Sequence, residues 1–139
     1  MDREQTQAYI HTAKAALTFI GGWVGWFLGD FDGFLYALVV FTLVDYATGV
    51  LCAVAERRLS SSVGTRGIAK KIAIFALVGV GHTVDAFVIG QGNAVRTAVI
   101  FFFLSNEGIS LLENSTRLGL PVPQALKDTL SQLHARLDR

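Results

Sequence analysis

The feature that most constrains this chain is a series of apolar runs, each close to the length that a lipid bilayer demands. The run Phe34–Ala55 holds a single charged residue, Asp45, and is long enough to cross a membrane as a helix, which takes about 20 predominantly apolar residues. Further runs of this kind are Ala15–Gly29, Ile68–Gly90 and Ala94–Glu113. The sequence therefore predicts an all-α integral membrane protein, one domain over residues 1–139, with four transmembrane helices.

The composition agrees with this fold class and excludes others. Hydrophobic residues make up 52% of the chain and charged residues only 17%, whereas soluble domains usually have about 25% charged residues. A net charge of +1, with no block of basic residues, gives no reason to expect a nucleic-acid partner. Because Cys52 is the one cysteine, no disulfide can form within the chain, and no motif predicts a metal site. The lipid bilayer is the first partner to expect.

Two of the four segments fit a crossing less well than the others. Ala15–Gly29 is short, although the preceding residues Tyr9–Lys14 could lengthen it. The second half of Ala94–Glu113 is polar. Three crossings plus one helix that lies in the membrane interface is therefore the alternative.

The positions of the basic residues predict an orientation. They lie in residues 1–14, in the loop 56–67 with the start of the next segment, and after the fourth segment: Arg3, Lys14, Arg57, Arg58, Arg66, Lys70, Lys71, Arg117, Lys127, Arg136 and Arg139. The short connections hold Asp30 and Asp32, with Arg96 at the edge. Since Lys and Arg accumulate on the cytoplasmic side, four crossings place both termini and the loop 56–67 in the cytoplasm.

The C-terminal residues 122–138 predict a short amphipathic helix. Pro123 suits a first helical turn, and leucines follow at spacings of 4, 3 and 4: Leu126, Leu130, Leu133 and Leu137. Such spacing makes one narrow apolar seam. The helix either lies against the inner membrane surface or the basic loop, or it associates with another copy of itself.

Polar residues inside the apolar segments recur at helical spacing. An ionised side chain at the centre of a crossing helix costs about 2.5–3.5 kcal/mol, so such residues should face protein or water. Each of three segments carries its polar residues, with some small ones, on one face: Asp45, Thr48, Gly49, Cys52 and Glu56; Gly81, His82 and Asp85, with Lys71 in line; Asn106, Glu107, Ser110, Glu113 and Asn114.

Two interpretations of these faces stay open. They could form a network between the helices of one chain, or they could line a water-filled pore or an oligomer contact. The stripe Asn106–Asn114 has five polar members, more than one neighbouring helix normally satisfies. That number favours the water-facing or oligomer-facing interpretation.

Two further contacts are predicted from spacing. Gly21, Gly25 and Gly29 form consecutive small-residue steps, which let helix backbones approach closely, within the chain or between subunits. Asp85 and Arg96 flank the short connection between the third and fourth segments, and we expect an ion pair between them.

Four stretches of the chain together resemble a known family. They are Val44–Ser62, with Asp-Tyr-Ala-Thr-Gly and a basic exit; the Ser/Gly/Lys-rich Ser60–Lys71; Asn106–Pro123, with Asn-Glu-x-x-Ser-x-x-Glu-Asn before Gly-Leu-Pro-x-Pro; and the terminal "LKDTLSQL". This pattern is similar to that of the toxin-secretion/phage-lysis holins, small membrane proteins of phages and prophage-derived export systems.

The resemblance implies a function that composition alone does not give. Holins accumulate in the cytoplasmic membrane of the bacterial host, associate into homo-oligomers and open lesions through which an endolysin or a toxin leaves. They are not enzymes and need no cofactor. The rival functions are a small ion or solute channel or transporter subunit, with Asp45 and Glu107 relaying protons, and a structural membrane anchor for a partner protein.

Overall fold

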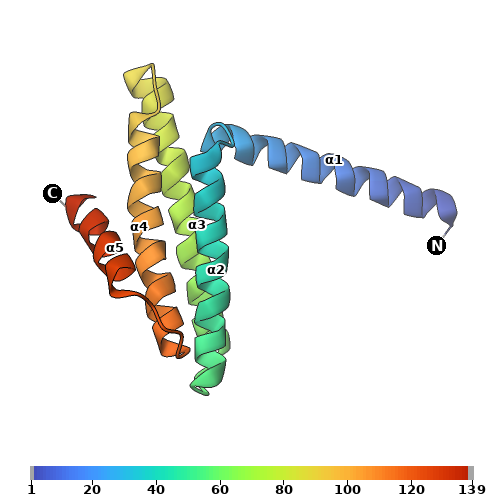
Figure 1. The fold of residues 1–139 in the computed structure, drawn as a ribbon. Coiled ribbons are helices and arrows are strands. Elements are labelled where there is room, and N and C mark those ends of the chain that lie inside the picture. Colours follow the sequence, from blue (N-terminus) through green and yellow to red (C-terminus); the bar gives the residue numbers. More distant parts are fainter. Residues whose placement is uncertain (1, 138–139) are drawn as a thin grey trace.

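The structure, a computed structural model, describes residues 2–137, and these form helices joined by short connections (Figure 1). The helices are α1 (Arg3–Leu28), α2 (Gly33–Ala55), α3 (Ser61–Thr83) with its continuation as a π-helical turn η1 (Val84–Ile89), α4 (Ala94–Arg117) and α5 (Gln124–Leu137). No strand occurs within residues 2–137. The all-α prediction is confirmed.

Helices α2, α3 and α4 lie side by side as a bundle, in which α4 contacts both of the others (Figure 1). Its apolar core contains Leu35 and Leu38 from α2, Ile74 and Val78 from α3, and Ile100 from α4, each at most 2% exposed. Lipid tails are as apolar as these side chains, so in a bilayer the core is stabilised by van der Waals packing more than by exclusion of water.

Within residues 2–137, three helices are long and apolar enough to cross a membrane: Gly33–Ala55, Ser61–Ile89 and Ala94–Arg117. The fourth predicted crossing, Ala15–Gly29, falls in the C-terminal half of α1 and is not among them. Its glycines and tryptophans contribute little hydrophobicity, and the residues before it are polar. Four crossings are therefore not confirmed.

Helix α1 leaves the bundle at a steep angle instead of lying along it (Figure 1). None of its residues is buried. Its last turn is held by α3, because the ring of Phe27 fills the space over Gly79, where an added Cβ would lie 2.0 Å from a ring carbon. The start of α2 is fixed separately, since Asp32 Oδ1 accepts a hydrogen bond from Leu35 N at 2.8 Å, a standard N-cap.

The helix boundaries differ from the predicted ones in two places. Helix α3 begins at Ser61 rather than Ile68, because the Ser60 hydroxyl accepts a hydrogen bond from Val63 N and caps a turn that the loop composition concealed. Helix α4 continues to Arg117 rather than ending at Glu113. The predicted loop 56–67 is thereby reduced to residues 56–60.

Helix α5 lies where a C-terminal helix was predicted and folds back along α4 (Figure 1). Of the four predicted seam leucines, Leu126 is exposed. The side chains of Leu130, Leu133 and Leu137 are outside the described part of the chain, as are residues 138–139. The amphipathic character of α5 stays a prediction.

Candidate functional site

The bundle has two distinct ends, each with its own cluster of buried polar residues. We call the end with connections 29–32 and 90–93 the hairpin end, and the end with connections 56–60 and 118–123 the basic end. The apolar core of Leu35, Leu38, Ile74, Val78 and Ile100 belongs to the three crossing helices that join these ends.

The basic-end cluster consists of Asp45, Lys71, Glu107 and Asn114. The ammonium of Lys71 on α3 donates hydrogen bonds to Asp45 Oδ2 on α2 and to Glu107 Oε2 on α4, so one cation ties all three helices together. Glu107 is 2% exposed and Asp45 is 8% exposed. Because each charge lies beside an opposite one, the cluster can lie within membrane-crossing helices.

Asn114 extends this cluster along α2. Its side-chain amide donates to Asp45 Oδ1 at 3.1 Å, to the Asp45 carbonyl at 3.3 Å and to Thr48 Oγ1 at 3.1 Å. The Cys52 thiol donates to the Asn114 carbonyl, with 3.4 Å between sulfur and oxygen. The predicted polar face of α2 is thus turned towards α4.

The predicted stripe on α4 divides into two groups. Glu107 and Asn114 are buried in the network between helices, as one interpretation expected. Asn106 and Ser110 are half-buried and Glu113 is exposed. With Glu107, these three line a cavity of about 370 Å³, completed by Lys70, Phe103 and Ile109. One helix therefore carries both an internal network and an outward polar surface.

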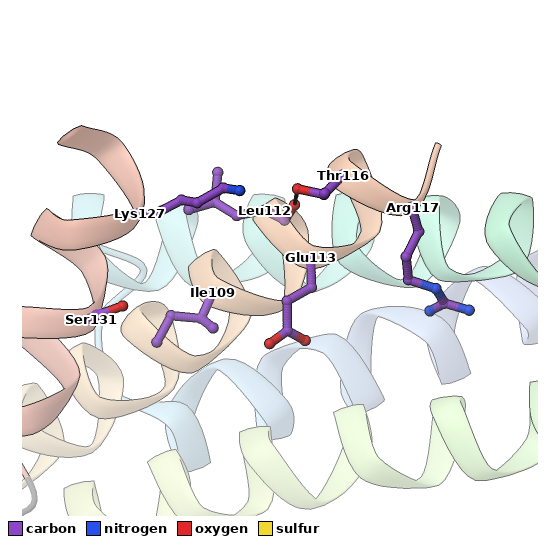
Figure 2. A pocket seen from close by; sticks show the side chains of 7 residues that line it. All are labelled: Ile109, Leu112, Glu113, Thr116, Arg117, Lys127 and Ser131. Carbon is purple, nitrogen blue, oxygen red and sulfur yellow. Dashed lines mark hydrogen bonds between the residues drawn. The ribbon is translucent and has the colours of Figure 1, made fainter. Parts of the chain in front are cut away.

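A second cavity of about 460 Å³ separates α4 from α5 (Figure 2). Its walls combine apolar and charged side chains: Ile109, Leu112, Glu113, Thr116, Arg117, Lys127 and Ser131. Glu113 lines this cavity as well as the preceding one. Among the stripe residues, it is the one that is exposed.

The basic end is also tied by an exposed ion pair. Arg117 Nε and Nη2 donate to the two carboxylate oxygens of Glu56 at 2.9 and 2.8 Å. These hydrogen bonds lower the pKa of Glu56 below its ordinary value of 4.5. The pair joins the last residue of α4 to the connection that follows α2.

The hairpin-end cluster is organised by Arg96, whose side chain is 1% exposed. The guanidinium donates to the Leu28 carbonyl at 2.7 Å, to the Asp30 carbonyl at 2.6 Å and to Asp32 Oδ2 at 2.7 Å. Arg96 thus holds the α1–α2 connection against the start of α4. Its hydrogen bond lowers the pKa of Asp32 below the ordinary value of 3.8.

The predicted side-chain ion pair between Asp85 and Arg96 is wrong. The hairpin does bring the two residues together, but Asp85 accepts hydrogen bonds from the backbone N–H groups of Val95 at 3.1 Å and Arg96 at 2.8 Å. A carboxylate at this position satisfies unpaired donors in the first turn of α4 and favours its dipole. The Arg96 side chain is directed to Asp32 instead, a partner that lies far away in sequence.

His82 lies beside this cluster and against Gly29. A Cβ at Gly29 would lie 2.8 Å from His82 Nδ1 and 3.0 Å from Arg96 Nε, and Gly29 also has a φ of +81°, which glycine adopts readily. His82 Nδ1 is buried without a hydrogen-bond partner among the residues described. Gly29 is therefore needed for close packing within the chain.

The other predicted contact glycines differ in their surroundings. Gly49 faces the Asn114 side chain at an ordinary distance, whereas Gly21 and Gly25 have no atom within 4 Å of an added Cβ. Besides Gly29, close approaches lie at Gly79 and Gly81, which were not predicted as helix-contact positions; a Cβ at Gly81 would lie 3.0 Å from the Arg96 Cα. Neither glycine belongs to a small-residue repeat, and the glycine content of this helix was the only available signal.

The described residues contain no group of three or more His, Cys, Asp or Glu side chains placed to hold a metal ion. What they contain is a bundle of three apolar helices with charged clusters buried at both ends. These features define a class: small helical membrane proteins whose polar residues face other helices rather than lipid.

The chain belongs to the bacteriophage holin family, whose model matches residues 22–135. The resemblance to holins that the sequence motifs indicate is thereby confirmed. Family and helices together identify a multi-pass bacterial membrane protein.

The chain is also similar to individual proteins along most of its length. An uncharacterized protein of Listeria innocua is 43% identical over 117 residues, covering 84% of this chain and 83% of the relative. An uncharacterized protein of Clostridium perfringens is 36% identical over 121 residues, covering 87% and 90%. A probable holin of Bacillus phage phi105 is 26% identical over 106 residues, covering 76% and 78%. No solved structure gives a significant match.

Proposed function

We propose that this chain is a holin that associates with copies of itself in the cytoplasmic membrane and opens a hole there. The hole lets a cell-wall-degrading endolysin, or a secreted toxin, leave the cytoplasm. The observation that carries the proposal is the basic-end cluster, which places charged side chains inside three apolar helices of a chain that belongs to the bacteriophage holin family.

The cluster suits a protein that has a closed and an open arrangement. In the single chain, Asp45, Glu107 and Asn114 are satisfied by Lys71 and by one another. If the helices separate around water, the same groups regain their hydration, and this offsets the hydrogen bonds that are lost. If the helices separate in lipid, nothing offsets that loss. The cluster therefore favours either a closed bundle or a water-filled hole over helices that are separated in lipid.

We propose that the outward polar residues of α4 form the initial lining of the hole. Asn106, Ser110 and Glu113 already line a cavity with Lys70 at the surface of the single chain. Neighbouring copies that meet over this surface would enclose polar groups and water. Gly21 and Gly25, which have open space around them, are available for contact with another subunit.

We propose further that the basic end faces the cytoplasm. It carries Arg57, Arg58, Arg66 and Lys70 beside the connection 56–60, and the chain after α4 adds Lys127. Short segments rich in Lys and Arg stay on the cytoplasmic side. The C-terminus then lies in the cytoplasm.

Expression in bacteria tests the function. We expect the chain alone to stop growth and collapse the membrane potential, and the chain with a co-expressed endolysin to lyse the cells, while endolysin alone does neither. Changed uptake of a solute with the potential intact would instead favour a transporter subunit. If none of these effects occurs although the protein is present in the membrane, the result would favour a structural membrane anchor for a partner protein.

A further inference from the structure

Helix α1 is the largest part of the molecule that the bundle leaves uncovered. Several of its large apolar side chains are more than half exposed: Leu17 70%, Phe19 77%, Trp23 57% and Trp26 62%. It is not among the helices suited to crossing a membrane. In a membrane protein, exposed apolar side chains such as these need contact with lipid or with another protein. The contacts at the C-terminal end of α1 restrict which of these it can be.

The exit direction of α1 is fixed by contacts on two sides. The Phe27 ring fits over Gly79 of α3, and Arg96 of α4 donates to the carbonyls of Leu28 and Asp30. The helix then runs away from the bundle across the direction of the crossing helices (Figure 1). It joins α2 at the hairpin end, where the crossing helix α2 begins. The C-terminal end of helix α1 therefore lies at the boundary of the bilayer.

The side chains of α1 are also sorted around its axis. One narrow face carries polar residues and then glycines, at spacings of 4, 3, 4, 3 and 4: Gln7, His11, Lys14, Thr18, Gly21 and Gly25. These spacings keep one face of an α-helix. From Ala13 to Leu28 the rest of the circumference is apolar or aromatic except at Gly22, and it includes both tryptophans of the chain, Trp23 and Trp26. Tryptophan is enriched at the membrane–water interface.

We infer that α1 lies in the surface of the bilayer at the hairpin end, with its aromatic side in the lipid and its N-terminus on the same side as residues 90–93. The partner of this face is a lipid surface. The Gln7–Gly25 face points away from lipid, which keeps its glycines accessible to another subunit. This placement rests on the crossing bundle and not on the formation of a hole.

The charge distribution allows this placement. With α1 on the surface, only Arg3 and Lys14 move to the hairpin side, where Asp30 and Asp32 also lie. The basic end keeps Arg57, Arg58, Arg66, Lys70, Lys71, Arg117 and Lys127. The asymmetry that sets orientation therefore does not require α1 to cross. The placement differs from the prediction of two cytoplasmic termini and corresponds to its alternative, three crossings plus an interfacial helix.

Single-cysteine labelling tests the inference. The starting variant is Cys52→Ala, to which Gln7→Cys, Gln91→Cys or Ser62→Cys is added, all at exposed positions. A membrane-impermeant maleimide is applied to spheroplasts before and after permeabilisation. We expect Gln7→Cys to label before permeabilisation, as Gln91→Cys does at the hairpin end, while Ser62→Cys labels only afterwards.

Ser62→Cys is the control for an intact membrane in this experiment. Ser62→Cys that stays unlabelled shows that the membrane is intact and that no hole admits the reagent. Labelling of Gln7→Cys only after permeabilisation, or under neither condition, would overturn the surface placement. His11→Cys, which is exposed and lies on the same face as Gln7, provides a second reading on the same helix. A chain that labels as expected but never supports lysis would overturn the holin function alone.

Discussion

Lys71 is the residue on which the basic-end cluster depends. It is the cation that contacts both Asp45 and Glu107, and its side chain is only 15% exposed. The neighbouring Lys70 is exposed and lines the outer cavity. The two lysines are adjacent in sequence but differ in surroundings, and composition alone could not distinguish them.

Replacing Lys71 by Met should therefore be far more costly than replacing Lys70 by Met. The first change leaves two buried carboxylates without their cation, and breaking a buried ion pair costs about 3–5 kcal/mol. The second removes only a solvated charge. Thermal unfolding in detergent measures the difference. Equal unfolding temperatures for the two variants would show that the cluster is not a buried ion-pair network.

The ion pair between Arg96 and Asp32 makes the stability of the fold depend on pH. Because the folded-state pKa of Asp32 is below its ordinary value of 3.8, the ionised carboxylate stabilises the fold above that value. This contribution is lost as the pH falls through the folded-state pKa. We expect Asp32→Asn, which can still cap α2, to lower the unfolding temperature at neutral pH and to reduce its decline in acid. An unchanged acid profile in the variant would contradict the pair.

At the scale of the helices, the lengths of the apolar runs predicted α2, α3 and α4 as crossing helices but not where α3 begins. Because Ser60 caps that helix, the Ser- and Gly-containing residues 61–67, which were predicted as part of a loop, are helical. The Arg96 partner was missed for a different reason: Asp32 and Arg96 meet only once three helices are packed. Spacing within one hairpin favoured Asp85 instead. Local patterns give helices and faces, while the pairing of faces is a property of the packed bundle.

The packing of α1 on α3 predicts opposite effects of two glycine substitutions. Gly79→Ala would place a Cβ 2.0 Å from the Phe27 ring, and overpacking of this kind costs about 1–3 kcal/mol. Gly25→Ala meets no atom within 4 Å and should be neutral or slightly stabilising in a single chain. Thermal unfolding in detergent compares them, and Phe27→Ala should restore part of the stability lost in Gly79→Ala. Equal effects at the two glycines would contradict this contact.

For the whole molecule, we propose a bundle that is closed by the same polar groups that later face water. Glu107 and Lys71 should then act in opposite directions. Glu107→Leu leaves a balanced Asp45–Lys71 pair in the closed bundle and removes a polar group from the lining, so opening should be slower. Lys71→Met leaves two unpaired carboxylates in the closed bundle, so opening should be faster.

The most direct test is the time course of dye release from vesicles that contain equal amounts of the wild-type chain, Glu107→Leu or Lys71→Met. We expect slower release for Glu107→Leu and faster release for Lys71→Met, relative to the wild type. Release that is unchanged in both variants, or that shifts in the same direction in both, would contradict this proposal.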